Sequence, residues 1–427
     1  MQLSDDGETL LSLVSESGDV RVPDSVRVIG PGVFKNTTLR TIDLNNVVAI
    51  GPGAFKNTNL ISVDLSRVEY IGDNAFYNTK LWKVNLSSVE YLGDGAFEKS
   101  SLTKVKGRCT VEIGNRAFYN TNLQSIDLSK VKYIGDNAFY KTKLRTVDLS
   151  SVEFLGHGAF EKSSLTKVEG RCTVENIGDN AFYKTKLVSI DLSGVKNIGK
   201  SAFMATKLVS VDLSSVLDIG EMAFSASSLQ IVSGLGLGSP VRIRRFAFAH
   251  TKLSFIDLGW GGTIEDGAFY KTNLESVDVD MVRSVGDAAF RDCQYLKVLV
   301  SRPVHPDAFI GCKLVVNASG RDITGSIVID PGLLELRDEL VELWRQRTPD
   351  AGIVRGLRRR RRTGNAPGLG LGVRVSRIWS HFHGMRENVL RLLFPLLVQE
   401  GRVSDHGVFK QVMKDLGVKK LTPKLRY

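Results

Sequence analysis

Residues 194–201 read GVKNIGKS and match the phosphate-binding pattern G-x-x-x-x-G-K-[ST]. Where this pattern binds nucleotides, backbone N–H groups of the glycine-rich loop surround the phosphates and the lysine reaches the terminal ones. The motif here follows an expected strand and precedes an expected single turn of helix. The same register reads KVKYIGDN at 130–137, so the repeat sets the backbone shape. Nucleotide binding at Gly194–Ser201 is therefore only a remote alternative.

A second group of polar side chains forms one acidic column with about one member per repeat. Stacked strands lie about 4.8 Å apart, where like charges oppose pairing, so the column could be retained for a cationic protein partner. Alternatively, each carboxylate caps the turn after its strand, and lysines such as Lys83 and Lys167 relieve the repulsion. One carboxylate per coil lacks the converging ligands that Ca²⁺ needs, so we expect no metal site. The predicted binding residues are Asp43, Asp64, Asp127, Asp148, Glu169, Asp191, Asp212, Asp257 and Asp278.

The remaining reactive side chains match no known catalytic pattern. The six histidines are scattered, none pairs with cysteine at metal spacing, and neither G-x-S-x-G nor H-E-x-x-H occurs. Four cysteines in 427 residues indicate a reducing compartment rather than a disulfide framework. Cys293 and Cys312 fall on adjacent coils and could pair, although buried free thiols are the preferred interpretation. We therefore expect a protein that is not an enzyme and that uses no cofactor.

The elements that position these residues are set by a phenylalanine that returns about every 21 residues, from Phe34 to Phe309. In residues 123–143, Leu123, Ile126 and Leu128 point one way from a short strand, and Ala138-Phe139 opens a predicted helical or 3₁₀ turn. A unit this short cannot bury its own apolar face, so units must stack. The sequence predicts an α/β repeat solenoid of about 14 coils, each with one strand and one short helical turn.

The repeated pattern [IV]DLSxVxxIGDxAFxxTxL resembles the BspA-like leucine-rich repeats of bacteria, protists and large DNA viruses. The resemblance covers about residues 26–315. It departs from the family in its shorter units and in reading YKTK or YNTN after the phenylalanine rather than a Gly-Cys turn. The resemblance implies a curved right-handed solenoid whose concave face serves adhesion or partner binding, and it does not imply an enzyme.

The rest of the chain is divided by composition and charge. We expect an N-terminal cap at 1–25, a C-terminal cap and docking helix at 316–350, a basic Arg/Gly-rich linker at 351–377 and a small helical domain at 378–427. Residues 351–427 contain 17 Lys and Arg against 4 Asp and Glu, whereas residues 1–350 contain 40 against 42. The stretch GRVSDHGVFKQVMKDL (401–416) resembles the SRI-type helical domain, which binds the phosphorylated polymerase tail.

Five consecutive arginines open the basic linker: Arg358, Arg359, Arg360, Arg361 and Arg362. This run is typical of nuclear import signals, of nucleic-acid contacts and of contacts with acidic membranes, but also of a plain flexible linker. The amino terminus lacks the basic n-region of a secretory signal, and no apolar stretch of about 18 residues predicts a membrane span. We expect a monomeric intracellular adaptor, with the nucleus as one candidate location, whose tail reaches an import receptor or nucleic acid. The alternative is a cell-surface or secreted adhesin.

Overall fold

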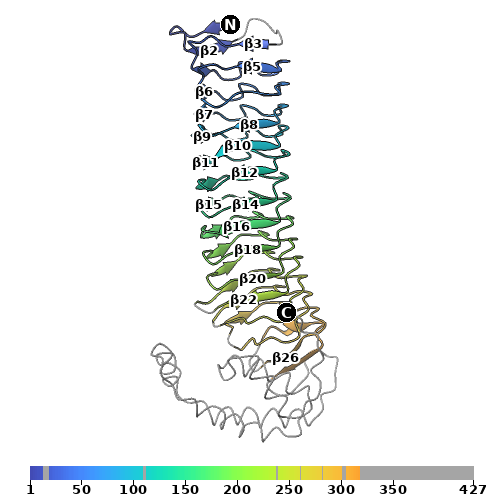
Figure 1. The fold of residues 1–427 in the computed structure, drawn as a ribbon. Coiled ribbons are helices and arrows are strands. Elements are labelled where there is room, and N and C mark those ends of the chain that lie inside the picture. The colour runs from blue at the N-terminus through green and yellow to red at the C-terminus, as the bar shows by residue number, and fades with distance from the viewer. Residues whose placement is uncertain are drawn as a thin grey trace, which may run out of the picture. The chain divides into compact units, whose positions relative to one another are not determined.

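The computed structural model describes residues 1–12, 19–108, 112–236, 239–259, 261–280, 282–300 and 304–317. The chain divides into Met1–Ile329 and Asp330–Tyr427, and all of the described residues belong to the first part. The predicted docking helix, the Arg358–Arg362 run and the SRI-like helices all lie outside the described residues. The account below therefore concerns the repeat array, whose successive coils are stacked in chain order (Figure 1).

One edge of the stack is a continuous sheet of 15 strands, each two residues long except the four-residue strand Thr9–Ser12. The first pair is antiparallel and covers the start of the stack, and every later pair is parallel and in register, as in Tyr133↔Phe154. Its strands are β1 (Gln2–Leu3), β2 (Thr9–Ser12), β4 (Val28–Ile29), β6 (Ala49–Ile50), β7 (Tyr70–Ile71), β9 (Tyr91–Leu92), β11 (Glu112–Ile113), β13 (Tyr133–Ile134), β15 (Phe154–Leu155), β17 (Asn176–Ile177), β19 (Asn197–Ile198), β21 (Asp218–Ile219), β23 (Arg242–Ile243), β24 (Thr263–Ile264) and β25 (Ser284–Val285).

A second set of strands carries the acidic column, and we call its outward surface the strand face. These strands pair in parallel groups of two or three, and two isolated parallel bridges, Thr41↔Ser62 and Phe255↔Ser276, occur on the same face. They are β3 (Asp19–Arg21), β5 (Thr41–Asp43), β8 (Lys83–Asn85), β10 (Lys104–Arg108), β12 (Ser125–Asp127), β14 (Thr146–Asp148), β16 (Lys167–Arg171), β18 (Ser189–Asp191), β20 (Ser210–Asp212), β22 (Ile231–Ser233), β26 (Lys297–Val300) and β27 (Leu314–Asn317).

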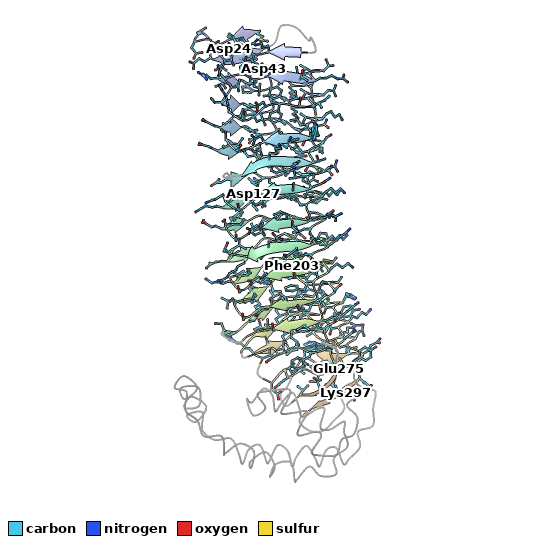
Figure 2. The ribbon with its side chains drawn as sticks, viewed as in Figure 1. Asp24, Asp43, Asp127, Phe203, Glu275 and Lys297 are labelled. Carbon is cyan, nitrogen blue, oxygen red and sulfur yellow. The ribbon has the colours of Figure 1, made fainter. Side chains whose placement is uncertain are left out.

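The core between the two sets of strands is a stack of the fourteen recurring phenylalanines. Successive rings from Phe34 to Phe309 lie 4.9–5.6 Å apart and within 2–9° of parallel. Each ring is buried, including Phe203 in the middle of the side chains drawn in Figure 2. Burying one such side chain stabilises the fold by about 1.5–3 kcal/mol, so the stack confirms the prediction of a continuous core.

The predicted helical turn in each coil is wrong, and the fold is a β-solenoid rather than an α/β repeat. Asn137 and Lys141, on either side of Phe139, have φ values of 55° and 56°, which a right-handed helix does not allow. The N–H groups of these three residues donate to carbonyls of the next coil at 2.8–2.9 Å instead of to their own turn. Among the described residues, a single 3₁₀ helix occurs, η1 (Pro306–Phe309).

Candidate binding surface

The carboxylates of the acidic column cap the turns that follow their strands. In all eight aspartates of the column, Oδ1 accepts the backbone N–H two residues ahead at 2.8–3.1 Å, as Asp191 does from Ser193. The remaining member, Glu169, instead accepts from the Lys167 ammonium at 3.3 Å. The turn-capping interpretation is therefore confirmed for the aspartates. Capping occupies one of two carboxylate oxygens, so it does not exclude contact with a partner.

Three arginines are paired in register with aspartates of the column. Strand pairing places Arg108 in register with Asp127 and Arg171 in register with Asp191. Both arginines follow a glycine at positive φ, Gly107 (83°) or Gly170 (71°), where β10 and β16 shift register against the next strand. The column is thus a series of short acidic segments separated by positive charge, rather than one uniform stripe.

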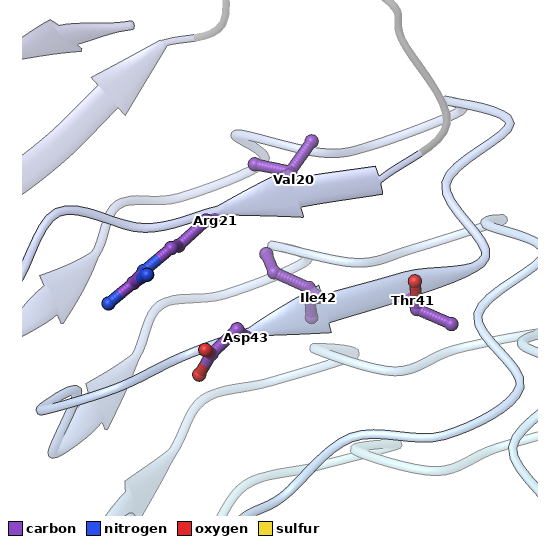
Figure 3. A pocket seen from close by; sticks show the side chains of 5 residues that line it. All are labelled: Val20, Arg21, Thr41, Ile42 and Asp43. Atoms are coloured by element: carbon purple, nitrogen blue, oxygen red, sulfur yellow. The ribbon is translucent and has the colours of Figure 1, made fainter.

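The third arginine lies at the N-terminal end of the strand face. Arg21 on β3 pairs in register with Asp43 on β5, and Figure 3 shows both side chains at the same end of their strands, beside a shallow pocket. Farther along, hydrogen bonds from Ser193 and then the positive charge of Arg171 hold the pKa of Asp191 below its usual value. The carboxylate of Asp191 is therefore ionised well below neutral pH.

Apolar side chains on the same face were missed by the sequence analysis, which examined only its charged positions. Trp82 is 52% exposed and Ile231 is 58% exposed, although both belong to coils whose inward residues are fully buried. The carbonyl of Val209 accepts the N–H of Ile231, which places these two residues on neighbouring coils. Reading the other outward positions of each L-x-x-[IV] unit would have found the whole set. Its members are Ile61, Trp82, Val188, Val209, Ile231 and Phe255.

The phosphate-loop interpretation of Gly194–Ser201 is wrong. The N–H groups of Gly199, Lys200 and Ser201 donate to acceptors on neighbouring coils, Ile177 O, Asp179 Oδ1 and Glu221 O, at 2.7–2.9 Å. The Lys200 ammonium lies 2.9 Å from a carboxylate oxygen of Glu221. These N–H groups therefore extend the ladder between coils and do not converge on one point, as a phosphate cradle requires.

One group of side chains has the composition of a metal site. The potential ligand atoms of Asp287, His305 and Asp307 all lie within 4.8 Å of one another, and all three residues are exposed. However, the His305 Nδ1 atom accepts the N–H of Asp307 at 3.3 Å and so caps the start of η1. That hydrogen bond occupies one of the two imidazole nitrogens, so the capping of η1 explains why His305 lies next to Asp307.

The cysteines of the described residues are buried free thiols. Cys293 and Cys312 take the place of the threonine found in other coils, and each donates its thiol to a phenylalanine carbonyl 3.1 Å away, in Phe269 and Phe290 respectively. Burial raises the pKa of the Cys172 thiol to about 11. Since the thiolate is the reactive form, this environment suits a packing role rather than a nucleophilic one.

Comparison with known proteins agrees with the repeat pattern and the solenoid. The BspA type leucine rich repeat region (6 copies) matches residues 15–112, 111–230, 175–297 and 238–315. The chain belongs to this BspA-type family of leucine-rich repeat proteins. No curated protein matches this BspA-type chain. Among its described residues, no helix has the length and apolar character needed to cross a membrane.

Several solved structures are similar to this BspA-type chain. A leucine rich cell surface protein from Faecalibacterium prausnitzii is 23% identical, with 70% of this chain and 78% of that chain covered and a TM-score of 0.35. A leucine-rich repeat protein from Eubacterium ventriosum is 19% identical, with 70% and 74% covered and a TM-score of 0.33. The pneumococcal vaccine antigen PcpA is 20% identical, with 74% and 71% covered and a TM-score of 0.29.

Proposed function

We propose that this BspA-type chain is a non-enzymatic binding scaffold whose strand face contacts a protein partner. The observation that supports the proposal is the combination, on one face, of exposed apolar side chains with short acidic segments. Apolar side chains that remain in water contribute little to the stability of the fold, whereas clusters of them are typical of protein interfaces. Charged residues around an apolar centre add specificity and speed association.

The C-terminal part of the strand face is the part we assign to the partner. There, Val209, Ile231 and Phe255 are 39–58% exposed on successive coils. Asp212 follows Val209 by three residues, and Asp257 follows Phe255 by two residues. A partner that presents apolar side chains surrounded by lysine or arginine would bury the three apolar residues and form ion pairs with the two aspartates. This partner is the cationic protein expected from the sequence.

The coils around Trp82 have the opposite charge on the strand face. Trp82 is followed by Lys83, and strand pairing brings Lys83 and Lys104 together. The neighbouring Lys106 lowers the pKa of Lys83, first through a side-chain hydrogen bond and then through charge repulsion. A partner that spans both parts would therefore need an acidic segment next to its tryptophan-binding side and a basic segment at the other end.

Substitutions taken from the repeat itself test this proposal. Val209→Gln, Ile231→Ser and Phe255→Ser introduce the residues that other coils carry at the same outward positions, such as Gln124, Ser210 and Ser276. The triple variant should keep its thermal stability and lose partner proteins that the wild-type chain captures under chemical cross-linking. A matched triple variant of the 15-stranded sheet, Tyr70→Asn, Tyr91→Asn and Phe154→Asn, should keep them. Equal capture by all three proteins would contradict the proposal.

Two settings for this scaffold remain, and localisation separates them. One is an intracellular adaptor addressed by the Arg358–Arg362 run, and the other is a surface or secreted adhesin. The F. prausnitzii protein is described as a cell surface protein. Tagged full-length protein would be imaged beside a variant with Arg358–Arg362 changed to alanine. Nuclear signal that the variant loses would support the adaptor, and glycosylated protein at the surface or in the medium would support the adhesin.

A further inference from the structure

The turns that follow the buried phenylalanines form a strongly basic edge of the solenoid. We define the turn edge as the four residues after each of the fourteen phenylalanines, from 35–38 to 310–313. These turns contain 14 lysines and arginines against 3 acidic residues, although residues 1–350 as a whole contain 40 against 42. The positive charge of the array is thus concentrated on one edge, and that edge is separate from the strand face.

Backbone geometry does not account for the lysines at the centre of this edge. The second residue after each phenylalanine has a positive φ, which asparagine tolerates better than other side chains, and asparagine occupies this position at Asn36, Asn57, Asn78 and Asn120. Five coils have lysine there instead, with φ values of 54–56°, and all five side chains are exposed. These lysines are Lys99, Lys141, Lys162, Lys184 and Lys271.

Tyrosines hold these lysines in a row along the stack. The ammonium group of Lys162 lies over the rings of Tyr140 and Tyr183, 5.1 and 5.7 Å from their centroids, and so spans neighbouring coils. The Lys99 ammonium donates to the hydroxyl oxygen of Tyr77 at 2.7 Å. Cation–π contacts and hydrogen bonds of this kind restrict the lysine side chains while leaving their charge in place.

The acidic residues of the edge neutralise only part of this charge. Glu98 lies 2.8 Å from Arg116 and 3.7 Å from Lys99, and Glu161 lies 2.8 Å from Lys162. The coils of Tyr140 and Tyr183 each read YKTK and contain no acidic residue in their turns. Lysine occupies the second turn position in five of the nine coils from Lys99 to Lys271, and three of these, Lys141, Lys162 and Lys184, lie on successive coils. Three coils without lysine at this position separate Lys184 from Lys271.

The shape of the edge favours one class of anion. A row of ammonium groups along the stack can contact an extended polyanion over many coils. The phosphates of duplex DNA wind around the helix axis and therefore move out of contact with such a row. Single-stranded nucleic acids depend on stacking of bases on aromatic rings. The tyrosine rings here are half-buried and already covered by lysines or, for Tyr119 and Tyr140, by each other at 4.5 Å. We propose that the turn edge, centred on Lys99 to Lys271, binds an acidic polysaccharide through the sulfates or carboxylates along its chain.

This site is independent of the protein-binding strand face, and both could be occupied at once. Binding would rest mainly on charge, so the affinity should fall steeply with salt as counterions are released. Heparin is a suitable sulfated probe, and binding of the full-length chain would be measured by calorimetry at several NaCl concentrations. Duplex DNA and phosphatidylserine vesicles would be measured in parallel.

Three variants of the full-length chain make the test specific. The edge variant, Lys99→Asn, Lys141→Asn, Lys184→Asn and Lys271→Asn, inserts the residue that other coils carry at this position. The control variant removes four lysines from the strand face: Lys83→Ser, Lys104→Ser, Lys167→Ser and Lys297→Ser. The tail variant changes Arg358–Arg362 to alanine. Thermal melting of each variant checks that the fold is retained.

We expect the edge variant to bind heparin at least tenfold more weakly at 150 mM NaCl and with a shallower salt dependence, and the control variant to stay within twofold of wild type. Wild-type affinity in the edge variant would overturn the proposal, as would an equal loss in the control variant. A loss confined to the tail variant would assign the binding to the arginines. Tighter, edge-dependent binding of DNA or vesicles would replace the polysaccharide with that partner.

Discussion

Replacing Phe139 with alanine would remove one ring from the middle of the phenylalanine stack. The ring is fully buried and lies 5.4 Å from Phe118 and 5.2 Å from Phe160. Loss of its burial costs about 1.5–3 kcal/mol. Loss of two stacked contacts adds about 0.5–1.5 kcal/mol each. Backbone hydrogen bonds on both sides hold the coils at their spacing and limit collapse, so we expect a total of about 4–5 kcal/mol, at the upper end for such substitutions.

The assay for this substitution must resolve position along the stack, because repeat arrays unfold locally as well as globally. Urea denaturation would give the loss of stability, and hydrogen exchange would show whether faster exchange centres on the coils around Phe139. Phe154→Ala is the matched control: its side chain is 46% exposed and stacks only on Tyr133, so the change should cost less than about 1 kcal/mol. Similar costs for both substitutions would refute the reasoning that the stack stabilises the fold.

Three further predictions concern buried polar groups and titration. The Thr142 hydroxyl donates to Phe139 O at 3.0 Å, whereas the buried Ser163 hydroxyl in the matching position of the next coil has no partner among the described residues. Urea denaturation should therefore show a loss of about 1 kcal/mol for Thr142→Val and no loss for Ser163→Ala; equal losses would contradict this. Asp191→Asn should retain the turn cap but remove the charge, and so be less stable than wild type at pH 7. Because the folded pKa of Asp191 is depressed, this difference should disappear as the pH falls from about 4 through that pKa, as thermal melts at several pH values would show. The raised pKa of Cys172 should keep its thiol unmodified by iodoacetamide at pH 8 until urea unfolds the chain, and labelling of the folded protein in peptide mass spectra would disprove it.

The sequence predicts the stack well because the stack is periodic. Each phenylalanine from Phe34 to Phe309 occupies an equivalent place in its coil, so the 21-residue spacing records the contact directly. The aspartate column was predicted for the same reason, and the capping role of its members follows from the short reach of an aspartate side chain. These features depend on the local sequence and on contacts between equivalent residues of successive coils.

Other features depend on partners that the local sequence does not reveal. The turn around Ala138-Phe139 resembles a helix start, but its N–H groups donate to the next coil, and only stacking decides between those alternatives. The sequence also predicted only one strand per coil, whereas Tyr133 and Ile134 form a second strand because they pair with Phe154 and Leu155 of the next coil. The exposed Ile231 was missed because only the charged outward positions of each unit were considered.

The parallel ladders between coils also determine how the array would respond to a pulling force. Its hydrogen bonds run along the stacking direction, so tension applied to the two ends of the array acts on every interface between coils. A terminal coil packs against only one neighbour and should therefore detach first. Coils should therefore unfold one after another, beginning at the ends of the array. Each peeled coil of about 21 residues would release roughly 70 Å of extended chain. The solenoid would then extend under force in steps of equal length, and it would shorten as the coils restack when the force is removed.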